Sequence, residues 1–189
     1  MKNKFVVVML ASTLLFFMRA GTADSENENY FGIQYGIAQY NEDSISQEFN
    51  PTLLIGRFGH YFHPNFSLEG RLGLGVQDDT QRLPEFGVSG LDATLELDYI
   101  LGVYGKGHLN LTDSFSIYGV LGASEVKGTA SLPSIPGIKG NESNSGVSYG
   151  IGADLGIGHN IALNLEYMQY LDKPDFDIGV IGLGMVFSF

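Results

Sequence analysis

The sequence predicts an all-β fold, an eight-stranded antiparallel up-and-down transmembrane β-barrel. Apolar and polar residues alternate strictly over residues 66–76, where Glu69 and Arg71 lie on the polar parity. A period of two indicates a strand with one apolar and one polar face. Such stretches recur to the last residue, with no helical period after residue 24. Their connections alternate between short and long, which is typical of transmembrane barrels.

Eight alternating stretches follow one another along the chain. They lie near residues 30–40, 52–62, 66–77, 91–109, 115–126, 146–158, 161–171 and 177–189. Tight turns are expected at 63–65, 110–114 and 158–160, where Pro, Asn, Asp or Gly occur. The longer, polar and mostly acidic connections are 41–51, 78–90, 127–145 and 172–176.

Two stretches, 52–62 and 115–126, alternate less cleanly. We place Leu54 and Phe58 on the outer face because that assignment turns Arg57 inward. A soluble barrel with an apolar interior would also alternate. Three features favour a membrane barrel instead: aromatic residues near the strand ends, short turns on one side and the scarcity of Lys.

The N-terminus has the pattern of a secretory signal peptide. Lys2 and Lys4 precede an apolar run, and small residues lead to a predicted cleavage after Ala23. The run is shorter than a membrane-spanning helix needs, which disfavours a retained anchor. We therefore expect a signal peptide over 1–23, an acidic lead over 24–28 and a barrel domain over 29–189.

Composition limits the classes of partner. The chain has no Cys. Its formal net charge is −11, so it lacks the clustered basic residues that nucleic-acid binding requires. It is nevertheless 44% hydrophobic and contains 26 Gly, which is too apolar for disorder and too glycine-rich for helices.

Several short segments resemble the OmpA-like, opacity-type family of small outer-membrane β-barrels. They are residues 30–32, 56–59, 65–73 and the terminal aromatic strand 185–189. The resemblance implies an integral outer-membrane protein of a Gram-negative cell envelope, with both termini in the periplasm. It also implies outer-membrane lipid and lipopolysaccharide as surroundings, and barrel-assembly machinery that reads Phe187 and Phe189. We expect no counterpart of the periplasmic peptidoglycan-binding domain of OmpA itself.

Charged residues on the inner parity fall at similar distances from the short turns. They are Arg57, Glu69, Arg71, Lys106, Asp154 and Glu166. An eight-stranded barrel encloses little more than its own side chains, so these three cations and three carboxylates are expected to pair across the lumen. A plug that specifies structure is favoured over a gate or an ion path.

Glu96 and Asp98 lie on the parity predicted to face inward, nearer the long loops. Solvated carboxylates are the simpler expectation there, and weak cation binding at the mouth is the functional alternative.

The four His residues fall at or beside short turns and are expected not to converge on a metal, and no cofactor motif is present. No His is predicted near the outer loops to serve as a general base, so we expect no enzyme. The favoured function is therefore a structural or adhesion-type surface role carried by the long loops. A narrow porin-like channel for ions or small solutes is the alternative. One loop has an apolar, proline-containing tip that could contact an extracellular ligand or fold onto the mouth of the barrel: Leu132, Pro133, Ile135, Pro136 and Ile138.

Overall fold

The computed structural model describes residues 28–42, 45–82, 92–132 and 139–189. The predicted signal peptide over 1–23 lies outside the described residues, as does most of the acidic lead. The strands are β1 (Asn29–Glu42), β2 (Ile45–Phe49), β3 (Thr52–His63), β4 (Phe66–Gln77), β5 (Asp79–Arg82), β6 (Asp92–Asn110), β7 (Phe115–Ser131), β8 (Lys139–Gly156), β9 (Ile161–Asp172) and β10 (Phe176–Ser188).

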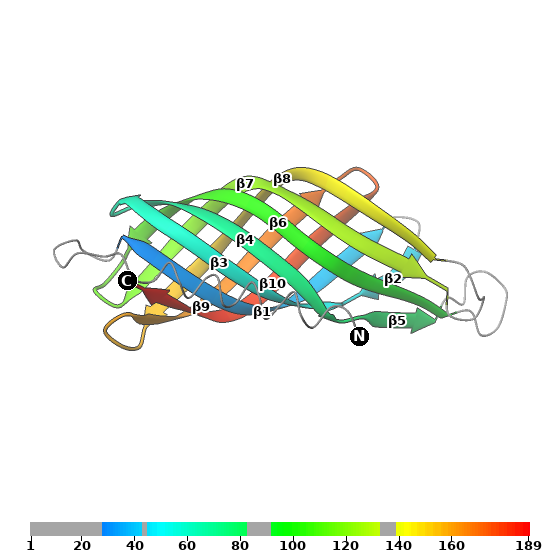
Figure 1. Ribbon diagram of the computed structural model, residues 1–189, viewed down its shortest axis with the longest axis horizontal. Coiled ribbons are helices and arrows are strands. Elements are labelled where there is room, and N and C mark those ends of the chain that lie inside the picture. Colours follow the sequence, from blue (N-terminus) through cyan, green and yellow to red (C-terminus); the bar gives the residue numbers. More distant parts are fainter. Residues whose placement is uncertain (1–27, 43–44, 83–91, 133–138) are drawn as a thin grey trace.

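Eight of these strands form a closed antiparallel barrel, as predicted (Figure 1). Among these eight, each strand pairs with the next one along the chain. β1 also pairs with β10, from Tyr30 opposite Ser188 to Glu42 opposite Phe176, and this pairing closes the barrel. The remaining two strands, β2 and β5, are short additions that pair with β1 and β6. No helix of the described residues is long and apolar enough to cross a membrane.

The two ends of the barrel differ. At one, called the short-turn end, β3–β4, β6–β7 and β8–β9 are joined by tight turns, and the C-terminus lies there (Figure 1). The opposite end, the long-loop end, holds the four longer connections. The connection predicted over 127–145 contains more strand than expected, because β7 continues to Ser131 and β8 already begins at Lys139. Of the predicted apolar tip, only Leu132 lies within the described residues.

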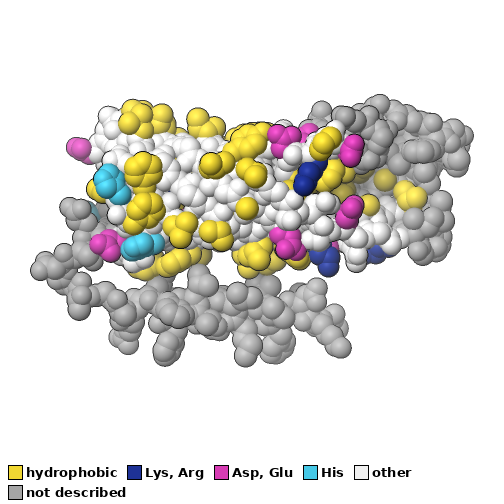
Figure 2. Space-filling model, turned by 90° about the horizontal axis from the view of Figure 1, so that it is seen from above, with side chains coloured by type: hydrophobic (Ala, Val, Ile, Leu, Met, Phe, Trp, Pro, Cys, Tyr) yellow, Lys and Arg dark blue, Asp and Glu magenta, His cyan; other side chains and the backbone are white. Residues whose placement is uncertain are grey.

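Large apolar side chains cover the outside of the barrel wall. Leu54 and Phe58 are 43% and 48% exposed, whereas Arg57 between them is 1% exposed. The assignment of this strand's faces is therefore confirmed. Figure 2 shows apolar side chains over the middle of the barrel, with charged side chains gathered towards the long-loop end. This outer surface is suited to lipid, because in a bilayer apolar side chains face hydrocarbon.

The interior contains an apolar layer that the sequence pattern did not predict. The layer lies towards the long-loop end and consists of Ala38, Leu53, Ile55, Leu97, Ile100, Val126, Met168, Leu171, Ile178 and Val180. The polar inner face that the alternating stretches predict is therefore present in only part of the lumen. Polar and charged inward residues are concentrated nearer the short-turn end, and apolar packing fills the rest.

Candidate functional sites: the luminal cluster and the mouth pocket

The barrel wall brings five charged side chains together in the lumen: Arg57 from β3, Glu69 and Arg71 from β4, Lys106 from β6 and Glu166 from β9. We call this group the luminal cluster. Each member is at most 3% exposed. Their strands curve around the barrel, so residues up to 109 positions apart in the chain contact one another.

Arg71 lies at the centre of the luminal cluster. Its Nη1 and Nη2 donate to the two carboxylate oxygens of Glu166 at 2.6 and 2.9 Å. Its Nε donates to Glu69 Oε1 at 2.6 Å. The guanidinium carbon also lies 4.7 Å from the centre of the Tyr104 ring. A guanidinium held by two carboxylates in this manner is the strongest ion-pair geometry available to side chains.

The other two cations have weaker contacts. Arg57 Nη1 lies 3.3 Å from Glu166 Oε2, while its Nε and Nη2 have no hydrogen-bond partner among the described residues. Lys106 Nζ lies 3.3 Å from Glu69 Oε2 and 3.9 Å from the centre of the Tyr118 ring. The luminal cluster therefore contains three cations and two carboxylates.

Asp154, the sixth predicted member, stands apart from these ion pairs. It is partly exposed, and its Oδ1 accepts a hydrogen bond from Asn164 Nδ2 at 2.6 Å. Within the described residues no ion pair joins it to a cation. A pattern of inward parity cannot distinguish it from Glu166. The register of β8 against β9 pairs Asp154 with Asn164 and Gly152 with Glu166, so Asp154 lies two residues nearer the short-turn end.

Neutral polar side chains complete the cluster, and the sequence analysis missed them. Tyr30 donates to Glu69 Oε2 at 2.6 Å, and Tyr118 donates to Glu166 Oε2 at 2.8 Å. Each Tyr lies directly opposite an inward Gly on the adjacent strand, Gly59 or Gly152, where a Cβ would collide with the ring. The pairing of inward Tyr with inward Gly is the signal that could have located them.

The two predicted mouth carboxylates do not face the lumen as a pair. The register of β6 against β7 shifts between Leu97 and Tyr99, which places Asp98 in a bulge. A bulge changes the parity of the residues beyond it. Leu95 and Leu97 consequently point inward, Glu96 takes the opposite parity, and Asp98 accepts a hydrogen bond from Thr129 at 3.0 Å. The predicted inward orientation of Glu96 and Asp98 is therefore wrong.

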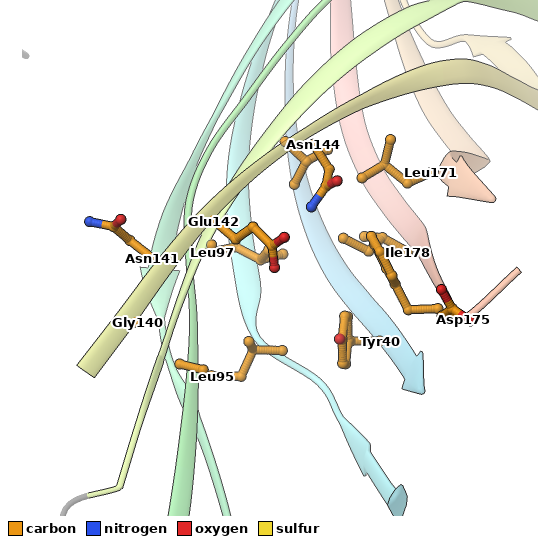
Figure 3. A pocket seen from close by; sticks show the side chains of 14 residues that line it. Tyr40, Leu95, Leu97, Gly140, Asn141, Glu142, Asn144, Leu171, Asp175 and Ile178 are labelled. Atoms are coloured by element: carbon orange, nitrogen blue, oxygen red, sulfur yellow. The ribbon is translucent and has the colours of Figure 1, made fainter. Parts of the chain in front are cut away.

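A pocket occupies the long-loop end of the lumen, with a volume of about 520 Å³. Its inner part is formed by four residues of the apolar layer, Leu97, Val126, Leu171 and Ile178, together with Leu95. Its rim carries Asn141, Glu142, Asn144 and Asp175 (Figure 3). We call this cavity the mouth pocket.

The His residues lie near the short-turn end and do not form a metal site. Among the described residues, no group of three or more His, Cys, Asp or Glu is arranged to hold a metal ion. His108 Nε2 lies 3.1 Å from Ser67 Oγ, a pair that resembles part of a nucleophilic site. Ser67 is fully buried and its oxygen also lies 3.3 Å from the Tyr30 hydroxyl, so a substrate has no access to it.

The C-terminal aromatics end the last strand at the short-turn end. Phe187 pairs with Phe31 of β1, and the Phe189 ring lies 6.4 Å from that of Phe58. Phe189 is 38% exposed on the barrel surface.

A family model described as "Outer membrane protein beta-barrel domain" matches residues 8–189. Among solved structures, Ail, the attachment invasion locus protein of Yersinia pestis, has a TM-score of 0.62 at 20% identity. The match covers 87% of this chain and 100% of Ail. A second Ail structure, in complex with the heparin analogue sucrose octasulfate, has the same TM-score and coverage at 21% identity.

Two further outer-membrane structures are similar at lower identity. Neisserial surface protein A has a TM-score of 0.58 at 13% identity, covering 85% of this chain and 97% of its own. OprG from Pseudomonas aeruginosa has a TM-score of 0.58 at 13% identity, and the match covers 87% of this chain and 97% of OprG. These identities indicate a shared fold only. No curated protein sequence matches the chain.

Proposed function

Because the chain belongs to the outer-membrane β-barrel family, and is therefore an integral protein of that membrane, we propose that it is a non-catalytic surface scaffold. The barrel is closed to solute passage, and the long-loop end interacts with partners outside the cell.

The observation that carries this proposal is the filling of the lumen by two successive layers. The luminal cluster joins β3, β4, β6 and β9 through ion pairs across the barrel. The apolar layer follows it towards the long-loop end, with Leu53, Ile55 and Ile100 completely buried. Eight-stranded barrels enclose just enough space for side chains, so a path for ions would require both layers to separate.

The proposed orientation places the short-turn end and both termini in the periplasm, and the long-loop end outside. Short periplasmic turns and longer external loops are the rule for such barrels. In this orientation Phe187 and Phe189 are available to the assembly machinery on the periplasmic side. The apolar outer wall contacts outer-membrane lipid, including lipopolysaccharide in the outer leaflet.

Charge indicates the kind of partner that the long-loop end favours. Carboxylates outnumber the cations at this end. In the described part of the chain the cations there are Arg82, Lys127, Lys139 and Lys173, and the carboxylates include Asp78, Asp79, Asp92, Glu125, Glu142, Asp172 and Asp175. Ail was solved with a sulfated heparin analogue. An acidic mouth repels such polyanions, so we expect a basic or neutral partner for this chain.

Conductance in planar lipid bilayers distinguishes the scaffold from the alternative, a narrow channel. Purified folded protein is inserted alongside an established porin as the positive control, and boiled protein serves as the negative control. We expect no stable openings from the folded protein at concentrations where the porin conducts. Reproducible openings that disappear on boiling would establish the channel and overturn the closed scaffold.

A further inference from the structure

We infer that the mouth pocket binds an amphipathic cation, an alkyl or aromatic group that carries an amine or guanidinium. This inference deepens the proposed function, since it names the chemistry that the long-loop end selects. The luminal cluster is packed and lies beneath the apolar layer, so it is not part of this site.

The inner part of the mouth pocket is suited to an apolar group. Leu97, Val126, Leu171 and Ile178 are each at most 4% exposed, and the bulge in β6 turns Leu95 and Leu97 towards the cavity. The volume of about 520 Å³ lies within the range of small-molecule pockets. Binding a phenyl or short alkyl group here would remove apolar surface from water on both partners.

The rim of the mouth pocket is suited to a cation. Figure 3 shows Glu142, from β8, and Asp175, from the connection between β9 and β10, on opposite sides of the cavity. Both side chains are exposed, and neither forms a side-chain hydrogen bond or ion pair with another described residue. Among the described residues, no Lys or Arg lines the pocket. An ammonium bound above the apolar floor would therefore meet two carboxylates that no described cation neutralises.

Aromatic residues at the rim add to this preference. The Tyr40 and Phe176 rings lie 5.9 Å apart with an interplanar angle of 30°, and both line the pocket. Aromatic faces attract cations, so the same region favours an ammonium over an uncharged polar group.

Part of β8 beside the mouth pocket has a backbone edge that does not pair with β9. Residues 149–156 of β8 pair with β9, whereas residues 139–148 pair only with β7 among the described residues. The open edge of β8 lies beside Glu142, so an extended peptide with adjacent apolar and basic residues could supply the same chemistry as a free amine.

Methyl NMR of the protein in lipid nanodiscs tests the site with a matched pair of probes. The probes are 4-phenylbutylamine and its neutral analogue 4-phenylbutanol. We expect saturable shifts of the Leu97, Leu171 and Ile178 methyl groups, with the amine bound several-fold more tightly than the alcohol. Equal affinity for the two probes overturns the inference, as does the absence of saturable shifts with both the amine and the peptides described below.

Substitutions locate the two parts of the site. Glu142→Gln with Asp175→Asn should remove the preference for the amine while leaving binding of the alcohol. Glu125→Gln, which removes a carboxylate from the outer face of β7, is the control and should leave the preference intact. Ala130→Phe, which fills the cavity, should weaken the binding of both probes about tenfold. Retention of the amine preference in the double variant contradicts the role of the rim.

A second arm separates the two sources of the ligand. Short extended peptides with Leu–Lys or Phe–Arg pairs are compared with the amine for binding to the same methyl groups. Binding by either supports the inference, and the stronger of the two identifies the source. Failure of both arms in a protein that shows no conductance overturns the inference alone and leaves the closed scaffold standing.

Discussion

Arg71 is the residue on which the luminal cluster most depends. It donates to both Glu69 and Glu166, at distances from 2.6 to 2.9 Å, and is 2% exposed. Burying charges costs several kcal/mol, which the barrel offsets only because each carboxylate is met by a guanidinium and by a Tyr hydroxyl. The cluster is therefore stable as a set and sensitive to the loss of its central member.

Replacement of Arg71 by Ala should destabilise the folded barrel by about 3–5 kcal/mol, because two buried carboxylates lose their main partner. The measurement is the urea midpoint in lipid vesicles, scored by the gel mobility of unboiled samples. Lys127→Ala on the outer face is the control and should leave the midpoint nearly unchanged. An unaltered midpoint for Arg71→Ala would contradict the structural role of the cluster.

Arg57 should behave differently from Arg71, although the sequence pattern treats the two alike. Arg57 has one ion pair at 3.3 Å and two nitrogens without partners, and its removal leaves two cations against two carboxylates. We expect Arg57→Met to cost about 1–3 kcal/mol, within the range for a lost buried hydrogen bond. A loss equal to that of Arg71→Ala in the same urea assay would show that the third cation is needed.

At the scale of elements, the barrel wall is built from strands whose inward Gly and Tyr residues face one another. Tyr30 lies opposite Gly59, Tyr118 opposite Gly152, and Tyr104 opposite Gly122. In each case the ring occupies the space where a Cβ would stand. Each Tyr presents its hydroxyl to a polar partner. Pairing between strands therefore positions the hydroxyl groups of Tyr30 and Tyr118, which donate hydrogen bonds to the carboxylates of the cluster.

Gly59→Ala should destabilise the barrel by roughly 1–3 kcal/mol, because the added methyl displaces the Tyr30 ring and its hydrogen bond to Glu69. Gly70→Ala is the matched control, since a Cβ at this outward position meets no atom within 4 Å. The same urea midpoints in vesicles report both changes. Similar effects of the two substitutions would show that intrinsic strand preference, and not the Tyr30 contact, determines the cost.

At the scale of the whole molecule, the two ends of one closed barrel have different roles. The short-turn end is compact and carries the C-terminal strand end. The long-loop end carries the acidic rim, the mouth pocket and the overhanging part of the β7–β8 hairpin. This asymmetry makes the proposed orientation in the membrane directly testable.

Single Cys substitutions report the orientation, because the chain contains no Cys of its own. A membrane-impermeant maleimide should label Lys139→Cys on intact cells. Asp113→Cys, in the β6–β7 turn, should be labelled only after the outer membrane is permeabilised. The opposite pattern would place the mouth pocket in the periplasm and contradict a surface role.

The sequence by itself determined the class of fold and nearly all of the strands. A period of two is a local property, so residues 66–77 could be assigned to a strand without any knowledge of their neighbours. The same parity placed Glu69, Arg71, Lys106 and Glu166 inside. Arg57 lies in a stretch without clean alternation and was placed inside because a charge on the outer face would meet lipid.

Only the tertiary structure decided which inward residues contact one another and where parity changes. The register between β8 and β9 places Asp154 opposite Asn164, nearer the short-turn end than Glu166, which separates Asp154 from the luminal cluster. The bulge in β6 turns Leu95 and Leu97 inward and removes Glu96 from the lumen, and nothing in the local pattern marks it. Pairing across strands therefore created the mouth pocket, because a cavity is a property of several strands packed together.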